Sequence, residues 1–317
     1  MKKNLNPKIS VIMSVYNGEQ FLEAAITSIL KQSFTDFEFI ILDDGSDDNS
    51  VDIINSYQDE RISLHNLNHQ GLPSALNYGI SIARAQLICR MDSDDIAHSE
   101  RFEKQLRFLD KNPEIDLCGT SISIIDENDQ LIGTRLMPVK HKEIIGTIDY
   151  SCNVIHPTYC FKKKIHDSIG GYRKELLYSQ DYDYLLRVID KGYKVHNLPE
   201  VLLKYRMMNK ANPEKTYNQM RYGGLAQQLH YERQKFGKEE QKTLDELKNL
   251  RTPNLIKKII YKSYNFFNKA RINGKFPKPL WILLSFLIAI FDKQIMKLII
   301  GDTKYYFNKR KLSQKTH

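Results

Sequence analysis

Three aspartates within four residues form the strongest chemical signal in this sequence. Residues 87–91 have the apolar character of a buried strand, and Asp92, Asp94 and Asp95 follow at the point where that strand would meet solvent. Carboxylates crowded in this way repel one another, and a hard divalent cation with oxygen ligands is the usual means of offsetting their charge. The other interpretation is a solvated acidic turn, which would complement the dipole of a helix expected to begin near His98.

The elements that would position these carboxylates alternate between strands and helices. Short apolar segments typical of buried strands cover residues 8–15, 37–42, 61–67 and 86–91. Apolar residues at helical spacing cover residues 19–30, 50–57, 72–85 and 99–110. The alternation predicts an α/β fold with a doubly wound, mainly parallel sheet, and shorter β-like pieces after residue 115 predict that the sheet becomes mixed there.

Polar segments end three of the expected strands, at residues 14–18, 43–46 and 92–95. Ligands of doubly wound sheets bind outside the carboxyl ends of the strands, so these segments should line one crevice. This context favours a metal site at Asp94 over a solvated turn. No Gly-x-Gly-x-x-Gly follows the first strand and no Gly-x-x-x-x-Gly-Lys-Ser is present, which disfavours standard dinucleotide and P-loop binding.

A further acidic residue opens a later helix. A helical pattern begins at Gln180, after the turn signal Gly170-Gly171, and places Asp181 in its first turn. An acid there stabilises the helix dipole by roughly 0.3 to 1 kcal/mol. It is equally compatible with a carboxylate directed at the crevice, and the residues alone leave both interpretations open.

The net charge of +9 is concentrated at the C-terminus. Residues 251–317 contain 15 Lys and Arg against two Asp, whereas residues 1–250 contain 32 basic against 36 acidic residues. This asymmetry argues against nucleic acid as the ligand of the main domain and indicates an anionic surface as the partner of the C-terminal part. The short polar N-terminus and the lack of Cys-x-x-Cys pairs predict a cytoplasmic protein with reduced thiols and no signal peptide.

The composition also changes along the chain, which predicts a catalytic domain at residues 1–215 and a helical, basic extension at residues 216–317. Residues 280–291 are a run of twelve residues, all apolar except Ser285, which is shorter than the roughly 20 needed to span a bilayer. The surrounding lysines and arginines predict an interfacial membrane segment around residues 280–300. The alternative is a buried helix packed on the main domain or on a partner subunit.

Five ordered motifs resemble those of family 2 glycosyltransferases with the GT-A fold, a Rossmann-like sheet. They are Val-Ile-Met-Ser-Val-Tyr-Asn at 11–17, Leu-Asp-Asp-Gly-Ser-Asp-Asp at 42–48, Asn-Tyr-Gly at 77–79, Asp-Ser-Asp-Asp at 92–95, and Gly-Gly-Tyr at 170–172 followed by Gln180-Asp181. The resemblance covers about residues 8–206. It implies a metal-dependent, inverting transfer of a sugar from a nucleotide sugar to a hydroxyl group.

The resemblance assigns roles to the first motifs. Ser14 and Tyr16 would line the base pocket, with Tyr16 stacked on a uracil, and Asp44 would bind the base or the ribose. Asp92-Ser93-Asp94 is similar to the Asp-x-Asp motif, in which the first carboxylate meets the ribose. The last carboxylate, Asp94, would coordinate Mg²⁺ or Mn²⁺ at the two phosphates.

The catalytic base implied by the resemblance is Asp181. The family commonly has Glu-Asp where this chain has Gln180-Asp181, so Asp183 competes for the role. His156 could contact the acceptor or the diphosphate, or it could be a structural histidine.

Processive synthases of the family carry Gln-x-x-Arg-Trp after the base, and Gln-Met-Arg-Tyr at residues 219–222 does not match. We therefore expect transfer of one hexosyl or N-acetylhexosaminyl group per encounter, from a UDP-linked donor. The acceptor would be a lipid-linked or surface glycan of capsule, O-antigen or exopolysaccharide synthesis, met at the inner face of the cell membrane. A sugar nucleotidyltransferase would need a glycine-rich, basic loop after the first strand, which is absent. A non-catalytic scaffold is disfavoured by the presence of both Asp94 and Asp181.

Overall fold

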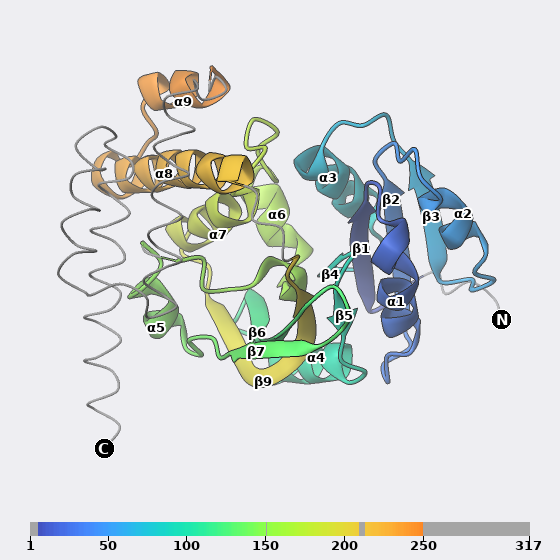
Figure 1. Ribbon diagram of the computed structural model, residues 1–317. Coiled ribbons are helices and arrows are strands. Elements are labelled where there is room, and N and C mark those ends of the chain that lie inside the picture. The colour runs from blue at the N-terminus through green and yellow to red at the C-terminus, as the bar shows by residue number, and fades with distance from the viewer. Residues whose placement is uncertain (1–5, 150, 209–212, 250–317) are drawn as a thin grey trace, which may run out of the picture. The chain divides into compact units, whose positions relative to one another are not determined.

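The computed structural model describes residues 6–149, 151–208 and 213–249 (Figure 1). Among these, residues 6–146 and 152–208 belong to one compact unit, and residues 147–149, 151 and 213–249 belong to a second. The predicted domain boundary at residue 215 stays a prediction.

The N-terminal half of the first unit is a parallel sheet. Its strands are β1 (Ile9–Val15), β2 (Phe37–Asp43), β3 (Ile62–Asn66) and β4 (Leu87–Asp92). They lie in the order β3-β2-β1-β4, and each neighbouring pair is parallel. The connecting helices are α1 (Glu19–Leu30), α2 (Ser50–Asn55) and α3 (Leu72–Ile82). This arrangement confirms the predicted doubly wound α/β fold.

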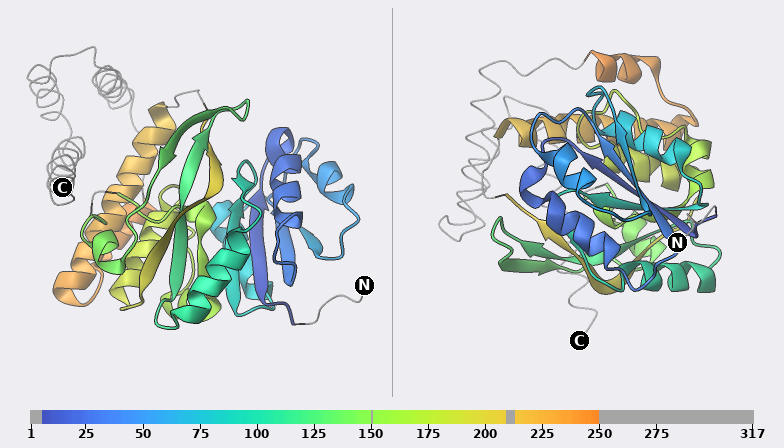
Figure 2. Two further views of the ribbon diagram at one scale, coloured as in Figure 1. Left: turned by 90° about the horizontal axis from the view of Figure 1, so that it is seen from below. Right: turned by 90° about the vertical axis from the view of Figure 1, so that its right-hand side faces the viewer.

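Strands β1, β2 and β4 are mostly apolar because helices cover both faces of the sheet (Figure 2). Val11 and Met13 pack in the core together with Leu22 of α1. Ile12 points to the other face, where α3 packs closely through Gly79. A Cβ atom at Gly79 would lie 3.0 Å from Ile12 and 2.6 Å from Leu42, so only glycine permits this approach.

The second half of the sheet is mixed, as the sequence predicts. Its strands are β5 (Ile96–Ala97), β6 (Leu117–Ile125), β7 (Leu131–Arg135), β8 (Cys160–Lys162) and β9 (Val195–Arg206). The full order is β3-β2-β1-β4-β8-β6-β9-β5, with β7 paired to β6. The sequence did not predict β9. Its pairing with β6 shifts register where Pro199 and Glu200 interrupt the strand pattern.

The helices of this half pack against its strands and against one another. They are α4 (Arg101–Lys111), α5 (His141–Ile145), the 3-10 helix η1 (His156–Thr158), α6 (Lys163–Ile169) and α7 (Gln180–Asp190). Predicted and observed helix ends differ by a few residues. The helix predicted over residues 72–85 ends at Ile82, because Ala83 already has an extended backbone.

The second unit contains two helices, α8 (Pro213–Phe236) and α9 (Gln241–Lys248). Gly237 follows α8 with a left-handed φ of 71°, which ends this helix within the predicted helical extension. The buried carboxylate of Glu232 joins the helices by accepting hydrogen bonds from the Thr243 hydroxyl and the Glu240 N–H. No helix in the described part of the chain is long and apolar enough to cross a membrane. The predicted interfacial segment around residues 280–300 lies outside the described residues.

Candidate active site

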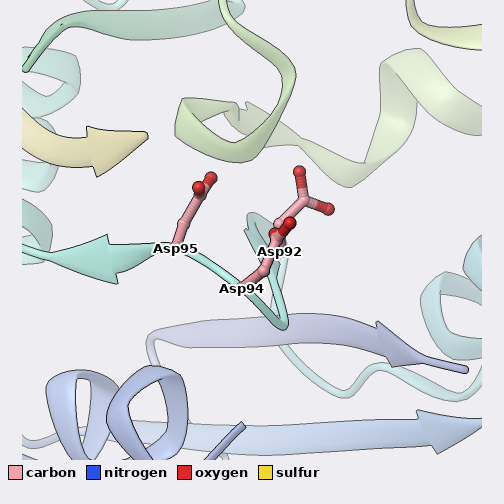
Figure 3. Close-up of side chains that lie close together, drawn as sticks. All are labelled: Asp92, Asp94 and Asp95. Atoms are coloured by element: carbon pink, nitrogen blue, oxygen red, sulfur yellow. The ribbon is translucent and has the colours of Figure 1, made fainter. Parts of the chain in front are cut away.

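The three aspartates of the sequence motif lie together at the carboxyl end of β4. Asp92 ends this strand, and Asp94 and Asp95 form the turn that leads to β5. One carboxylate oxygen from each lies within 4.8 Å of the others (Figure 3). Ser14 pairs with Asp92 in the register of β1 and β4, so the first and third polar segments adjoin. We call Asp92, Asp94 and Asp95 the carboxylate turn.

The carboxylate turn has an excess of negative charge. Burial, followed by the charge of Asp92, raises the pKa of Asp94 from 3.8 to about 6. Burial also raises the pKa of Asp95 well above 3.8, and the other two aspartates add to the shift. Among the described residues, Oδ2 of Asp95 is buried without a hydrogen-bond partner. This oxygen-only donor set fits a hard divalent cation such as Mg²⁺ or Mn²⁺.

Two arginines that the sequence analysis did not single out stand beside the carboxylate turn. The guanidinium group of Arg90 is 4% exposed and forms an ion pair with Asp92, which lies two residues further along β4. Residues two apart share one face of a strand, so this pairing follows from the strand geometry. The backbone N–H of Arg206, at the end of β9, donates a 2.8 Å hydrogen bond to Oδ1 of Asp95.

Asp181 is half-buried in the first turn of α7. Burial raises the pKa of the Asp181 carboxyl group, and the negative charge of Asp92 adds to this shift. A hydrogen bond from the Tyr182 N–H and the positive charge of Arg90 oppose it. The Tyr159 hydroxyl donates a 3.4 Å hydrogen bond to the backbone carbonyl of Asp181, and the Tyr159 carbonyl accepts a 2.9 Å hydrogen bond from the Arg90 N–H, so Tyr159 links the start of α7 to β4. A carboxylate with a raised pKa near a cluster of other acids has the property expected of a general base that works close to neutral pH.

Asp183, the competing candidate, has a different environment. It is fully buried and accepts a 2.8 Å hydrogen bond from Nε of Arg187, and Nε of Arg173 lies 3.6 Å away. A buried carboxylate held in two ion pairs is not available to take a proton from a substrate. Between the two residues, the geometry favours Asp181 as the base.

The residues assigned to the nucleoside surround the ends of β1 and β2. Tyr16 is half exposed, and its ring lies 4.2 Å from that of His69, centroid to centroid. Asp44 is buried, and its two carboxylate oxygens accept 2.8 Å hydrogen bonds from the N–H groups of Gln70 and Gly71. Asp44 therefore shapes the loop after β3, and its direct contact with a base or ribose stays a prediction.

Ser93 and His156 lie in different surroundings. The side chain of Ser93 is close to Gly18, where an added Cβ atom would lie 3.5 Å from the serine hydroxyl.

His156 is buried, and its Nε2 lies 2.8 Å from the Tyr172 hydroxyl. Burial holds the pKa of His156 well below its usual range, so the ring is neutral. This environment suits a structural histidine, and contact with an acceptor or diphosphate stays a prediction.

Tyr205 is a further residue that the sequence analysis missed. Burial, and after it the charges of Asp181 and the three aspartates of the carboxylate turn, raises the pKa of its phenol group. Tyr205 precedes Arg206 in β9, the strand that pairs with β5 directly after the carboxylate turn. The signal that could have found it is the alternation Val-Leu-Leu-Lys-Tyr-Arg at residues 201–206, which is typical of a strand.

Comparison with known proteins decides the family. The family model "Glycosyl transferase family 2" matches residues 10–170, which include the carboxylate turn. The chain belongs to this family. It is 34% identical to the O-antigen biosynthesis glycosyltransferase WbnJ of Escherichia coli, over 64% of this chain and 81% of WbnJ. It is also 32% identical to the amylovoran biosynthesis glycosyltransferase AmsE of Erwinia amylovora, over 63% of this chain and 78% of AmsE.

Solved structures confirm the fold of this family 2 glycosyltransferase. Residues 1–349 of S. aureus TarS match with a TM-score of 0.58 at 18% identity, over 95% of this chain and 92% of the TarS chain. Crystals of the same TarS fragment contain UDP or UDP-GlcNAc. The likeness supports the GT-A architecture predicted from the sequence motifs.

Proposed function

We propose that this glycosyltransferase moves one sugar, with inversion of configuration, from a UDP-linked donor to a hydroxyl group of a lipid-linked or surface glycan. The observation that carries the proposal is the grouping of Asp92, Asp94 and Asp95 within 4.8 Å at the end of β4, to which Tyr159 links Asp181 by hydrogen bonds. The names of WbnJ and AmsE support a glycan of O-antigen or exopolysaccharide type. The UDP and UDP-GlcNAc complexes of TarS support a UDP-sugar, with N-acetylhexosamine as one candidate.

Asp181 would act as the general base. As the acceptor oxygen attacks the anomeric carbon, the carboxylate takes the hydroxyl proton, and the bond from that carbon to the diphosphate oxygen breaks. A single displacement of this kind inverts the anomeric centre, so an α-linked donor gives a β-glycoside. A positioned base typically contributes ~100- to 10,000-fold to the rate. The raised pKa of Asp181 makes it a stronger base than an ordinary carboxylate.

Asp94 would hold the divalent cation, with Asp92 and Asp95 beside it. When bound, Mg²⁺ or Mn²⁺ supplies a Lewis acid that stabilises the negative charge on the leaving diphosphate. Arg90, whose side chain is buried, holds Asp92 in place through their ion pair. Arg90 pairs with Oδ1 of Asp92, so we expect the other carboxylate oxygen, Oδ2, to contact the ribose of the donor. Ser93, the next residue, would contact the nucleotide sugar as well.

Tyr16, Ser14 and Asp44 would form the nucleoside site at the ends of β1 and β2. The exposed ring of Tyr16 offers a surface on which a uracil can stack, and stacking of this kind contributes about 1–3 kcal/mol. The Asp44 carboxylate holds the loop at Gln70 and Gly71 that borders this site.

The basic C-terminal part would place the enzyme on the inner face of the cell membrane. Residues 251–317 carry 15 Lys and Arg against two Asp, and they include the apolar run at 280–291. Basic residues beside an apolar segment bind anionic headgroups and the interface of a bilayer. Such an anchor would bring the active site close to a lipid-linked acceptor.

The test is release of nucleoside diphosphate by the purified protein from a panel of UDP-, GDP- and dTDP-sugars. We expect release from a UDP-sugar with Mn²⁺, its loss with a chelator, and its loss in Asp181→Asn. The control is Asp110→Asn, which changes an exposed residue of α4. Nucleotide binding without release from any donor, in the presence of a range of glycan acceptors, would contradict an enzymatic role.

A further inference from the structure

Arg206 connects the carboxylate turn to another part of the first unit. It is the last residue of β9 and is 5% exposed. Its backbone N–H donates to Oδ1 of Asp95, and its Nε donates a 2.8 Å hydrogen bond to the backbone carbonyl of Asp94. One residue thus holds both the side chain of Asp95 and the main chain of Asp94.

The other end of the same guanidinium group reaches the turn between β6 and β7. Nη1 donates a 2.8 Å hydrogen bond to the backbone carbonyl of Asp126, and Nη2 lies 2.6 Å from the carboxylate of Asp129. Asp129 is 57% exposed and has a left-handed φ of 64°. The ring of Phe21, from α1, lies 4.1 Å from the guanidinium carbon.

These contacts use the shape of an arginine side chain. The planar guanidinium directs its N–H groups along several fixed directions, and here three nitrogens meet three different acceptors. A lysine ammonium keeps the charge but is a single point and cannot reach all three. Geometry as well as charge therefore fixes the position of the turn.

We propose that Arg206 is a positioning residue for the metal-binding carboxylates. Its guanidinium group locks the carboxylate turn against the β6–β7 turn, so that the oxygens of Asp94 and Asp95 stay together despite their mutual repulsion. The β6–β7 turn is then part of the framework of the site, although it supplies no ligand. This inference rests on the proposed function of the carboxylate turn.

The experiment compares wild type with Arg206→Lys and Asp129→Asn. Asp129→Asn removes the negative charge of one partner at an exposed position, and asparagine tolerates the left-handed backbone. The matched control is Arg61→Lys, because Arg61 also pairs with an aspartate, Asp59, donates to a carbonyl and stacks on a phenylalanine. Arg61 precedes β3, at the opposite end of that strand from the polar segments.

Two quantities are measured on the full-length chain: the Mn²⁺ dissociation constant by isothermal titration calorimetry, and amide hydrogen exchange. Groups that orient metal ligands typically contribute about 10- to 100-fold to metal affinity, so we expect a loss of at least about tenfold in Arg206→Lys. For Asp129→Asn we expect a loss of about threefold, because the other contacts remain. Exchange should rise at residues 93–97 and 126–131 in Arg206→Lys, and the Arg61→Lys control should leave both regions and the affinity unchanged.

Unchanged exchange at either turn in Arg206→Lys would overturn the proposal. So would faster exchange with wild-type Mn²⁺ affinity, because Arg206 would then be structural only. If Arg206→Lys does not fold, Asp129→Asn takes its place. Unchanged hydrogen exchange at either turn, or faster exchange with wild-type Mn²⁺ affinity, in Asp129→Asn would then overturn the proposal. A wild-type protein that binds no Mn²⁺ would contradict the proposed function itself, and the exchange comparison would then decide whether Arg206 locks the two turns.

Discussion

Replacing Asp94 by asparagine should stabilise the metal-free protein at neutral pH. Burial and the charge of Asp92 raise the pKa of Asp94 from 3.8 to about 6 in the folded state. A raised carboxyl pKa means that the folded state binds the proton more tightly than the unfolded chain does. Protonated Asp94 therefore makes its full contribution to the free energy of unfolding below about pH 4. This contribution is lost as the pH rises through about 6.

The size of the effect follows from the pKa shift. Each pKa unit corresponds to about 1.4 kcal/mol, so a shift of about two units corresponds to about 3 kcal/mol. Asparagine has nearly the same shape as aspartate but no charge, so it removes the repulsion with Asp92 and Asp95. At pH 8 the free energy of unfolding of Asp94→Asn should thus exceed that of wild type by about 2–3 kcal/mol. At pH 3.5 the two values should be nearly equal.

The assay is urea unfolding followed by circular dichroism, at both pH values, with chelator and then with Mn²⁺. At 100 times its dissociation constant, Mn²⁺ should stabilise wild type by about 2.7 kcal/mol, and the variant much less. Asp110→Asn, on the exposed face of α4, serves as the control for an ordinary surface change. A variant that is less stable than wild type at pH 8 in chelator would refute the reasoning, because the carboxylates would then not repel one another.

Three further predictions concern other parts of the chain. Asp181→Asn should lower kcat by ~100- to 10,000-fold with little change in donor KM, and wild-type activity should fall at low pH as the raised pKa of Asp181 is crossed. Asp183→Ala should lower the free energy of unfolding by about 3–5 kcal/mol, because it leaves Arg187 buried without its partner carboxylate; a small change in urea unfolding would show that the ion pair matters little. Deletion of residues 275–317 should move the protein from the membrane fraction to the soluble fraction after cell lysis, and an unchanged distribution would argue against the anchor.

The sequence was sufficient to predict the parallel half of the fold. Strands β1, β2 and β4 are covered on both faces, so each appears as a mostly apolar run that ends in polar residues. Because parallel strands place their carboxyl ends at one edge of the sheet, the proximity of Ser14 to the carboxylate turn also followed. These inferences need only local patterns and one rule of topology.

The residues that hold the site in place could not be predicted in this way. Arg206 contacts Asp94 and Asp95 only because β9 pairs with β5, and the strand pattern at residues 201–206 does not tell which strand it pairs with. The choice between Asp181 and Asp183 likewise depended on tertiary packing, because Asp183 is fully buried and faces Arg173 as well as Arg187, its partner at i,i+4 helical spacing. Such contacts depend on tertiary pairing, so no local pattern encodes them.

The most direct test of the central claim is calorimetric titration of UDP into the protein with Mn²⁺ or with chelator. The carboxylate turn should bind UDP through the divalent cation, so binding should be strong with Mn²⁺, weak with chelator and weak in Asp94→Asn. Asp181→Asn should bind UDP as wild type does, because the base acts on the acceptor. Equal UDP affinity with Mn²⁺ and chelator, or wild-type affinity in Asp94→Asn, would contradict the account.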